Sequence, residues 1–245
     1  MKECEVDNRT SLYNTINIII SKYNKYLILR RRNMAVIYNN LYQFSNYVQP
    51  INLTFHQYLL LTDEPLLIHT GNVQQAEALI PQLKETLNGK DLRYIFISHF
   101  EADECGGLSV ILKHFPQAKS ICSEVTARQL SGFGITNDII IKRAGEKLSI
   151  DQGELEFINY PSEMHLWGGL LVIENQSKIF FSSDLMFNLG EAAGRIVESK
   201  WSAEIDSISH EQVPDADKRG QLQQNLAELS PNFIATGHGP CIKLS

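Results

Sequence analysis

The stretch Ile95-Phe-Ile-Ser-His-Phe-Glu-Ala-Asp-Glu-Cys-Gly106 decides how the rest of the chain is interpreted. Apolar residues at 94–97 predict a short strand, and a helix-like run follows at residues 107–114. Between them stand four side chains with imidazole or carboxylate groups: His99, Glu101, Asp103 and Glu104. Such groups are costly to bury unless each other's charge or a metal compensates them, and they suit iron, manganese and zinc. The stretch therefore predicts a metal site on the loop after a strand.

The composition is that of an ordinary globular protein. The chain has 245 residues, of which 43% are hydrophobic and 20% charged, and this length can bury a full core. A net charge of −6 argues against a nucleic-acid binder, which needs a basic surface. The four cysteines form no Cys-x-x-Cys pair, and the apolar run at residues 16–20 is too short for a membrane span. We therefore expect a cytoplasmic protein that does not enter a membrane.

The predicted elements favour a sandwich fold. Short strands dominate from residue 35 onward, and helices are expected at residues 73–87, 107–114, 124–131 and 216–229. Pro81 lies inside the first helix and is expected to kink or split it, while Asp63-Glu64-Pro65 predicts a hairpin turn. This pattern favours an α/β (α+β) sandwich with sheets inside and helices outside. We interpret residues 1–34 as an N-terminal extension, with its packing on the domain left open, and residues 35–245 as one domain.

Three later residues share the position of the opening cluster, because each stands where a strand meets a turn. His165 precedes Trp167-Gly-Gly169, Asp184 ends an apolar strand, and His238 lies between two glycines in Gly237-His-Gly-Pro240. The flanking glycines permit a tight turn that aims the imidazole inward. We therefore expect these side chains to join the same site.

Six residues in chain order carry a resemblance to a known family: His99, Glu101, Asp103, His165, Asp184 and His238. Their order resembles the metallo-β-lactamase superfamily and, more narrowly, the diiron domain of flavodiiron proteins. The segments Phe181-Ser-Ser-Asp184 and Gly237-His-Gly-Pro240 resemble the family's local sequences, and the likeness runs from about residue 41 to the C-terminus. For residues 35–245 it implies a metallo-β-lactamase-like αββα sandwich, with a dinuclear site at one edge between the sheets.

The resemblance also implies the role of each ligand. The first metal ion is implied to be bound by His99, Glu101 and His165. The second is implied to be bound by Asp103 and His238, with Asp184 as the bridge. Related hydrolases usually carry histidine at the position of Glu101, and a carboxylate there makes the site harder and more anionic. This exchange favours two iron ions, with manganese or zinc as the alternatives.

Glu104 departs from the family pattern, which has histidine at this position. As a ligand of the second metal ion it would add negative charge and stabilise the ferric state. As an acid in the first turn of a helix it would be stabilised by the helix dipole, which leaves an open position for water or O2. Both interpretations stay open.

Four further residues are candidates for the surroundings of the site. His69 stands where most superfamily members carry aspartate, and it either supports a metal ligand or caps a strand end. His56 either lines the mouth of the site or is a half-buried histidine with satisfied hydrogen bonds. Phe100 and Trp167 are expected to wall the site against water.

The resemblance implies a non-haem diiron protein that binds O2 or NO, as an oxygen sensor or carrier, or as an oxidoreductase served by a separate reductase. The chain ends seven residues after His238 (245 − 238), so we expect no FMN in this chain and a separate electron donor or signalling partner. A head-to-tail homodimer is expected by analogy. Two alternatives stay open: a metal-dependent hydrolase of thioesterase or lactonase type, and a non-catalytic signalling module of the same fold.

Overall fold

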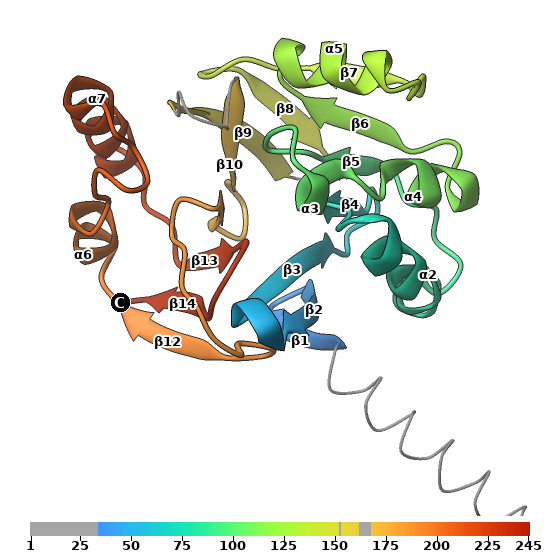
Figure 1. Cartoon of the computed structure of the whole chain (residues 1–245), viewed down its shortest axis with the longest axis horizontal. Coiled ribbons are helices and arrows are strands. Elements are labelled where there is room, and N and C mark those ends of the chain that lie inside the picture. The colour runs from blue at the N-terminus through green and yellow to red at the C-terminus, as the bar shows by residue number, and fades with distance from the viewer. Residues whose placement is uncertain (1–33, 152, 162–167) are drawn as a thin grey trace, which may run out of the picture.

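The computed structural model describes residues 34–151, 153–161 and 168–245, whose strands form two seven-stranded sheets (Figure 1). The first sheet has the order β1-β2-β3-β4-β5-β6-β7, and its strands are β1 Met34–Tyr38, β2 Leu41–Val48, β3 Leu53–Leu60, β4 Leu66–Ile68, β5 Tyr94–Phe96, β6 Lys119–Cys122 and β7 Ile139–Ile141. The second has the order β12-β14-β13-β11-β10-β9-β8, and its strands are β8 Lys147–Ile150, β9 Gly153–Tyr160, β10 Gly169–Glu174, β11 Ile179–Ser183, β12 Ile196–Ser199, β13 Phe233–Thr236 and β14 Cys241–Leu244.

Helices cover the outer faces of both sheets. They are α2 Val73–Leu87, α3 Ala102–Cys105, α4 Leu108–His114, α5 Glu124–Gly132, α6 Trp201–Asp206 and α7 Ala216–Ala227, with a 3-10 turn η1 at Gln49–Ile51. In Figure 1, α2 and α4 lie outside the first sheet on the right, and α6 and α7 lie outside the second sheet on the left. No helix among the described residues has the length and apolar character needed to cross a membrane.

Three apolar clusters hold these layers together. Phe96 and Phe157 lie in the cluster between the sheets, and both are at most 1% exposed. Leu67 and Leu79 join the first sheet to its helices, whereas Phe180 and Leu226 join the second sheet to α6 and α7. Burial of each face against a neighbouring layer is the main stabilising contribution to such a fold. The expected sandwich, with sheets inside and helices outside, is confirmed.

Helix α2 begins and ends where the sequence predicts, at Val73 and Leu87. Asn72 and Gln75 form a capping box, in which each side chain accepts a hydrogen bond from the other's backbone N–H, at 3.0 and 2.8 Å. Asn88, with φ of 47°, ends the helix in the left-handed region. Pro81 does not split the helix, because the buried apolar face continues through it and offsets the roughly 3 kcal/mol that an interior proline costs.

The sheet topology brings four strand ends together. Strands β4 and β5 are parallel neighbours in the first sheet, and β11 and β13 are parallel neighbours in the second. The carboxyl ends of neighbouring parallel strands meet at the same edge of a sheet, where open α/β sheets usually bind ligands. The residues that follow these four strands therefore face one another at one edge of the sandwich.

Several elements differ from the sequence expectation. Strand β3 is long, from Leu53 to Leu60, because it pairs with β2 along its whole length, from Leu53 opposite Val48 to Leu60 opposite Leu41. The sequence did not indicate β12, α6 or β14, and β12 and β14 pair in parallel through a long-range contact. Strand β4 pairs with β3 as the predicted hairpin around Asp63-Glu64-Pro65. Residues 1–33 of the expected N-terminal extension lie outside the described residues.

Candidate metal centre

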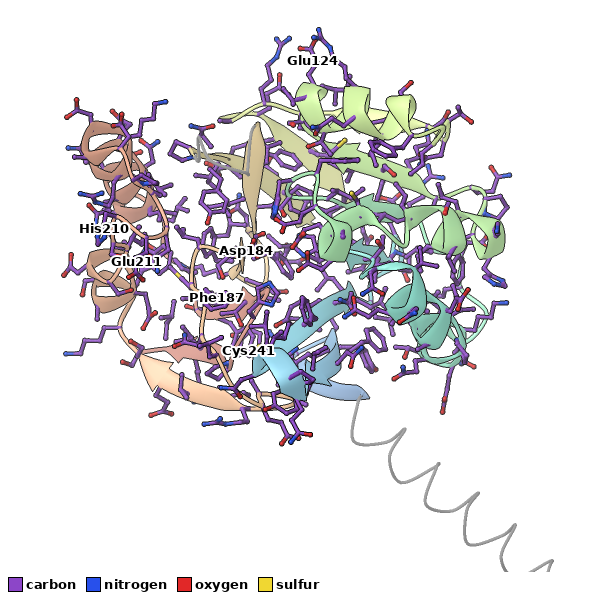
Figure 2. All side chains as sticks on the ribbon, viewed as in Figure 1. Glu124, Asp184, Phe187, His210, Glu211 and Cys241 are labelled. Carbon is purple, nitrogen blue, oxygen red and sulfur yellow. The ribbon has the colours of Figure 1, made fainter. Side chains whose placement is uncertain are left out.

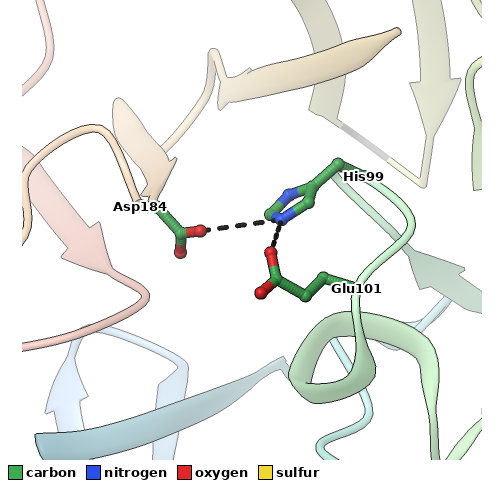
Figure 3. A group of neighbouring side chains, drawn as sticks. All are labelled: His99, Glu101 and Asp184. Carbon is green, nitrogen blue, oxygen red and sulfur yellow. Dashed lines mark hydrogen bonds and ion pairs between the residues drawn. The ribbon is translucent and has the colours of Figure 1, made fainter. Parts of the chain in front are cut away.

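The first group of candidate ligands surrounds the imidazole of His99, which follows β5 (Figure 3). Its Nε2 atom lies 3.1 Å from Glu101 Oε2 and 3.6 Å from Asp184 Oδ2. One ligand atom from each of these three residues lies within 4.8 Å of the others, close enough for one metal ion. His99 is fully buried, whereas the Glu101 side chain is 45% exposed and reaches the site from its outer side.

The second group consists of Asp103, Glu104 and His238, whose ligand atoms also lie within 4.8 Å of one another. The two acids belong to the short helix α3, and His238 follows β13. His238 Nε2 lies 3.4 Å from Asp103 Oδ2. Gly237 lets the chain turn here, because a Cβ at this position would stand 2.9 Å from the Ser183 carbonyl oxygen.

Asp184 lies between the two groups. Its Oδ2 atom is 3.6 Å from His99 Nε2, and its Oδ1 atom is 3.3 Å from His238 Nε2. One carboxylate oxygen thus faces each group, which is the arrangement that a bridging carboxylate requires. Glu104 is also central, since its Oε2 atom lies 3.6 Å from His99 Nε2 although Glu104 itself belongs to the second group.

Both histidines are oriented by hydrogen bonds on the nitrogen that faces away from the acids. His238 Nδ1 donates to the Thr54 carbonyl oxygen at 3.0 Å, and a carbonyl accepts only, so the hydrogen sits on Nδ1. His99 Nδ1 lies 2.9 Å from the Ser98 hydroxyl oxygen. In each ring Nε2 then points at the carboxylates, as a metal-binding imidazole with an oriented outer nitrogen does.

The charges of the site shift its protonation equilibria strongly. Burial lowers the pKa of His238, but Asp103 and Asp184 outweigh burial and raise it to about 10. Burial raises the pKa of Asp103, yet the contact with His238 prevails and lowers it to about 2. For Glu104, burial and the charges of Asp184 and Asp103 act together and raise its pKa well above the usual range. The fold therefore disfavours the ionised form of Glu104 unless an added positive charge compensates it.

The residues present fit a pair of cations. Glu104 Oε2 and Asp184 Oδ1 are buried and accept no hydrogen bond from the described part of the chain. Buried acceptors without partners are rare in proteins, and a bound ion is one of the partners that can satisfy them. Four carboxylates and two imidazoles are the hard and borderline donors that iron, manganese and zinc accept. A dinuclear metal site would satisfy both orphan oxygens and balance the acidic charge.

A cavity of about 590 Å³ opens over these residues. Glu101, Asp103, Asp184 and His238 lie in its wall, together with apolar and aromatic side chains that include Leu53, Phe55, Tyr160 and Phe187. Figure 2 shows Asp184 and Phe187 near each other in the middle of the molecule. The rings of Phe55 and Phe187 have centroids 5.0 and 5.3 Å from that of His238. The cavity is large enough for a small ligand, and its lining is partly apolar.

Other residues expected near the site fall in different places. His165 and Trp167 lie outside the described residues. His56 is buried, with Nδ1 2.7 Å from the Ser45 hydroxyl and Nε2 2.8 Å from the Gly239 carbonyl oxygen. Phe100 is not among the described residues that line the cavity, since its ring packs on Phe133, 5.2 Å away between centroids.

His69 lies behind the acids, with Nδ1 4.0 Å from Glu104 Oε1.

Sequence reasoning missed three residues that hold the ligands: Ser98, Ser183 and Thr54. Ser98 and Ser183 each precede a candidate ligand in the chain, a signal that could have drawn attention to them. Thr54 acts through its backbone carbonyl, for which the sequence holds no signal.

The fold is that of a metallo-β-lactamase-like protein. Residues 53–239 match the model of the family described as "ODP family beta lactamase", and the chain belongs to this family. The relatives that the chain matches include a diflavin flavoprotein of Thermosynechococcus vestitus, 25% identical over 200 residues, which cover 78% of this chain and 34% of that protein. The chain thus spans about a third of the length of the curated relatives it matches.

Solved structures share the fold. The metal-soaked flavodiiron core from Synechocystis sp. superposes with a TM-score of 0.72 at 20% identity, covering 86% of this chain and 57% of that one. Rubredoxin oxygen:oxidoreductase from Desulfovibrio gigas superposes with a TM-score of 0.67 at 16% identity, covering 86% and 57% of the two chains. These likenesses establish the flavodiiron core fold for this chain.

Proposed function

We propose that this chain is a non-haem diiron protein that binds O2, and NO as a second diatomic ligand, at the site formed around Asp184. One observation carries the proposal: the two oxygens of the Asp184 carboxylate face the two groups of candidate ligands separately, at 3.6 Å from His99 and 3.3 Å from His238. A carboxylate that lies between two such groups is suited to bridging two cations.

The residues of the proposed site divide into two sets. His99 and Glu101 would hold the first iron ion, and His165 would complete this set. Asp103, Glu104 and His238 would hold the second, and Asp184 would be shared between the two ions. When bound, a pair of ferrous ions supplies the electrons and the open coordination positions that O2 binding requires. The names of similar proteins support iron and oxygen, since they include a flavodiiron core and an oxygen:oxidoreductase.

The chain's own side chains determine how the site treats its ligand. The Thr54 carbonyl and the Ser98 hydroxyl hold the two imidazoles so that Nε2 faces the acids. Phe55 and Phe187 cover the His238 side of the cavity and limit the access of water. Four carboxylates against two described imidazoles give the site a net negative charge, which favours the more highly charged state of a bound metal.

The geometry of Glu104 supports a role as ligand of the second metal ion. Its side chain is 2% exposed, points toward the ligands and groups with Asp103 and His238, whereas an acid that merely stabilises a helix start lies at the surface. We propose that the electron donor or signalling partner is a separate protein, because one protein of similar fold is named a rubredoxin oxygen:oxidoreductase.

Anaerobic reconstitution with ferrous iron, followed by titration with O2, tests the proposal. We expect two iron ions per chain and a new visible charge-transfer band when O2 is added. The variant His238→Ala should lose iron and the band, whereas His114→Ala, which removes an exposed histidine at the end of α4, should retain both. Failure to take up ferrous iron, or tight zinc binding accompanied by ester hydrolysis, would contradict the proposal and favour the signalling or hydrolase alternative respectively.

A further inference from the structure

A buried serine connects three strand ends beneath the metal site. Ser98 Oγ lies 2.9 Å from His99 Nδ1, 2.8 Å from His69 Nε2 and 2.9 Å from Ser183 Oγ. All four residues are buried, with exposed fractions of 0 to 4%. Because these residues stand at or just after the ends of β4, β5 and β11, a single hydroxyl group links both sheets directly behind the candidate ligands.

The backbone on either side of this hydroxyl is strained to make the contacts. His69 and Ser183 have φ of 61° and 47°, in the left-handed region that residues other than glycine rarely adopt. Both conformations are held by backbone hydrogen bonds: His69 N–H donates to Phe96 O, and Gly237 N–H donates to Ser183 O, each at 2.9 Å. Such strain persists where the surrounding structure determines it, and it is concentrated at functional sites.

The hydrogen count of the network constrains the histidine tautomers. A serine hydroxyl donates one hydrogen bond and accepts two, so three partners use its full capacity. His99 Nε2 faces Glu101, Glu104 and Asp184, and a ring nitrogen that binds a metal must be free of hydrogen. The hydrogen of His99 therefore sits on Nδ1 and is donated to Ser98.

His69 and Ser183 share the remaining capacity of the hydroxyl. His69 Nδ1 faces the carboxylate of Glu104 across 4.0 Å, and this contact is attractive only when Nδ1 carries the hydrogen. His69 Nε2 is then a bare acceptor, to which Ser98 donates. Ser183 completes the network by donating to Ser98, so that each of the three hydrogen bonds to Ser98 has one donor and one acceptor.

We propose that Ser98 is a positioning residue, whose hydroxyl fixes the tautomers of His99 and His69 and so directs His99 Nε2 and the His69 Nδ1–H group into the metal site. The inference rests on the proposed function in one respect, namely that His99 and Glu104 bind metal. It predicts that the affinity for metal depends on Ser98, although Ser98 itself would not contact the metal. It also explains why a histidine, rather than another polar residue, stands behind Glu104.

Removal of this hydroxyl should weaken metal binding. Ser98→Ala leaves His99 Nδ1, His69 Nε2 and Ser183 Oγ without their partner, and both rings can then adopt the other tautomer. Loss of an outer hydrogen bond to a metal ligand typically lowers metal affinity by about 10- to 100-fold. Ser182→Ala is the matched control, because Ser182 is a fully buried serine whose hydroxyl makes no hydrogen bond within the described residues.

The test uses zinc as a diamagnetic probe. Zinc affinity is measured by competition with a chelator for the wild type, Ser98→Ala and Ser182→Ala. We expect a loss of about 10- to 100-fold for Ser98→Ala alone. The pair Ser98→Thr and Ser98→Val keeps the same side-chain shape with and without a hydroxyl, so Val should bind zinc more weakly than Thr. Equal affinities within both comparisons would overturn the proposal, whereas a wild type that binds no zinc would instead contradict the proposed metal site.

Long-range ¹H–¹⁵N spectra of ¹⁵N-histidine wild type provide a readout that needs no variant. In the zinc-loaded protein, His69 should carry its hydrogen on Nδ1 and show a bare Nε2, and His99 should carry its hydrogen on Nδ1. In Ser98→Ala the His69 signals should move toward the other tautomer or a mixture. A wild-type His69 with hydrogen on Nε2 would overturn the proposed network even if none of the variants folded.

Discussion

Replacement of Glu104 by glutamine should make the metal-free protein more stable and bind metal less well. Glu104 is 1% exposed, and its Oε2 atom accepts no hydrogen bond among the described residues. Burial and the charges of Asp184 and Asp103 raise its pKa, which means that the metal-free fold disfavours its ionised form. Glutamine keeps the shape, removes the charge and provides an amide that can donate to the neighbouring acids.

The size of the effect follows from the cost of an orphan buried acceptor, about 1–3 kcal/mol. Relief of about 2 kcal/mol corresponds to a rise in Tm of roughly 4–8 °C for a domain of this size. A group with a raised folded-state pKa contributes stability that is present below its unfolded pKa and is lost as pH rises toward the folded pKa. The gain from Glu104→Gln should therefore be small at pH 4 and grow as pH rises above 4.5.

Thermal unfolding with and without added zinc or ferrous iron measures both effects. The metal-free variant should melt above the metal-free wild type, and the rise in Tm on metal addition should be smaller in the variant, because a weaker Kd gives less stabilisation. Glu174→Gln is the control: Glu174 is also buried but accepts N–H bonds from Gln176 and Ser177 at 2.8 and 2.7 Å, so its replacement should destabilise. A metal-free Glu104→Gln protein that is less stable than wild type would refute the reasoning.

Three further predictions follow from the same contacts. Asp184→Asn should reduce metal content from two ions per chain to one, measured by elemental analysis, and two retained ions would disprove the bridging role. Gly107→Ala should lower the free energy of unfolding by about 1–3 kcal/mol in urea, since its Cβ would lie 2.3 Å from that of Ala76. The control Gly220→Ala, inside α7, places a Cβ that meets no atom within 4 Å, so it should stabilise the protein. Burial lowers the pKa of His56 to about 4, so its neutral ring stabilises the fold less and less as pH falls from 6.5 to 4. Over this range the wild type should lose up to about 3 kcal/mol more stability than His56→Gln. Equal losses would be inconsistent with a buried neutral ring.

Much of the fold was accessible from local sequence patterns. The apolar face of α2 predicted the extent of that helix, which the structure caps with Asn72 and Gln75 at its start and with Asn88 at its end. The short apolar run of β5 marked a buried strand, which is recognisable because both of its faces are covered. Strand β12 could not be predicted from the sequence, since its residues are mostly exposed. It pairs with β14, more than forty residues away in the chain, with Ile196 opposite Cys241.

The candidate site was predictable to the extent that its residues follow strands. His99, Asp184 and His238 each stand after a strand whose end faces the others, and a pattern of polar residues at strand ends reveals this. The hydrogen bonds that orient them were not predictable, because they join distant segments. His238 Nδ1 donates to a carbonyl 184 positions away in the chain, and Ser98 contacts Ser183 across the two sheets. The packing of Phe100 on Phe133, rather than over the site, likewise depends on the position of α5.

The central claim is that two metal ions share the carboxylate of Asp184. Anomalous diffraction at the iron edge from crystals of the iron-loaded protein tests this claim most directly. We predict two iron peaks on opposite sides of Asp184, one beside His99 and Glu101 and the other beside Asp103, Glu104 and His238. A single peak, or peaks away from Asp184, would contradict the dinuclear site.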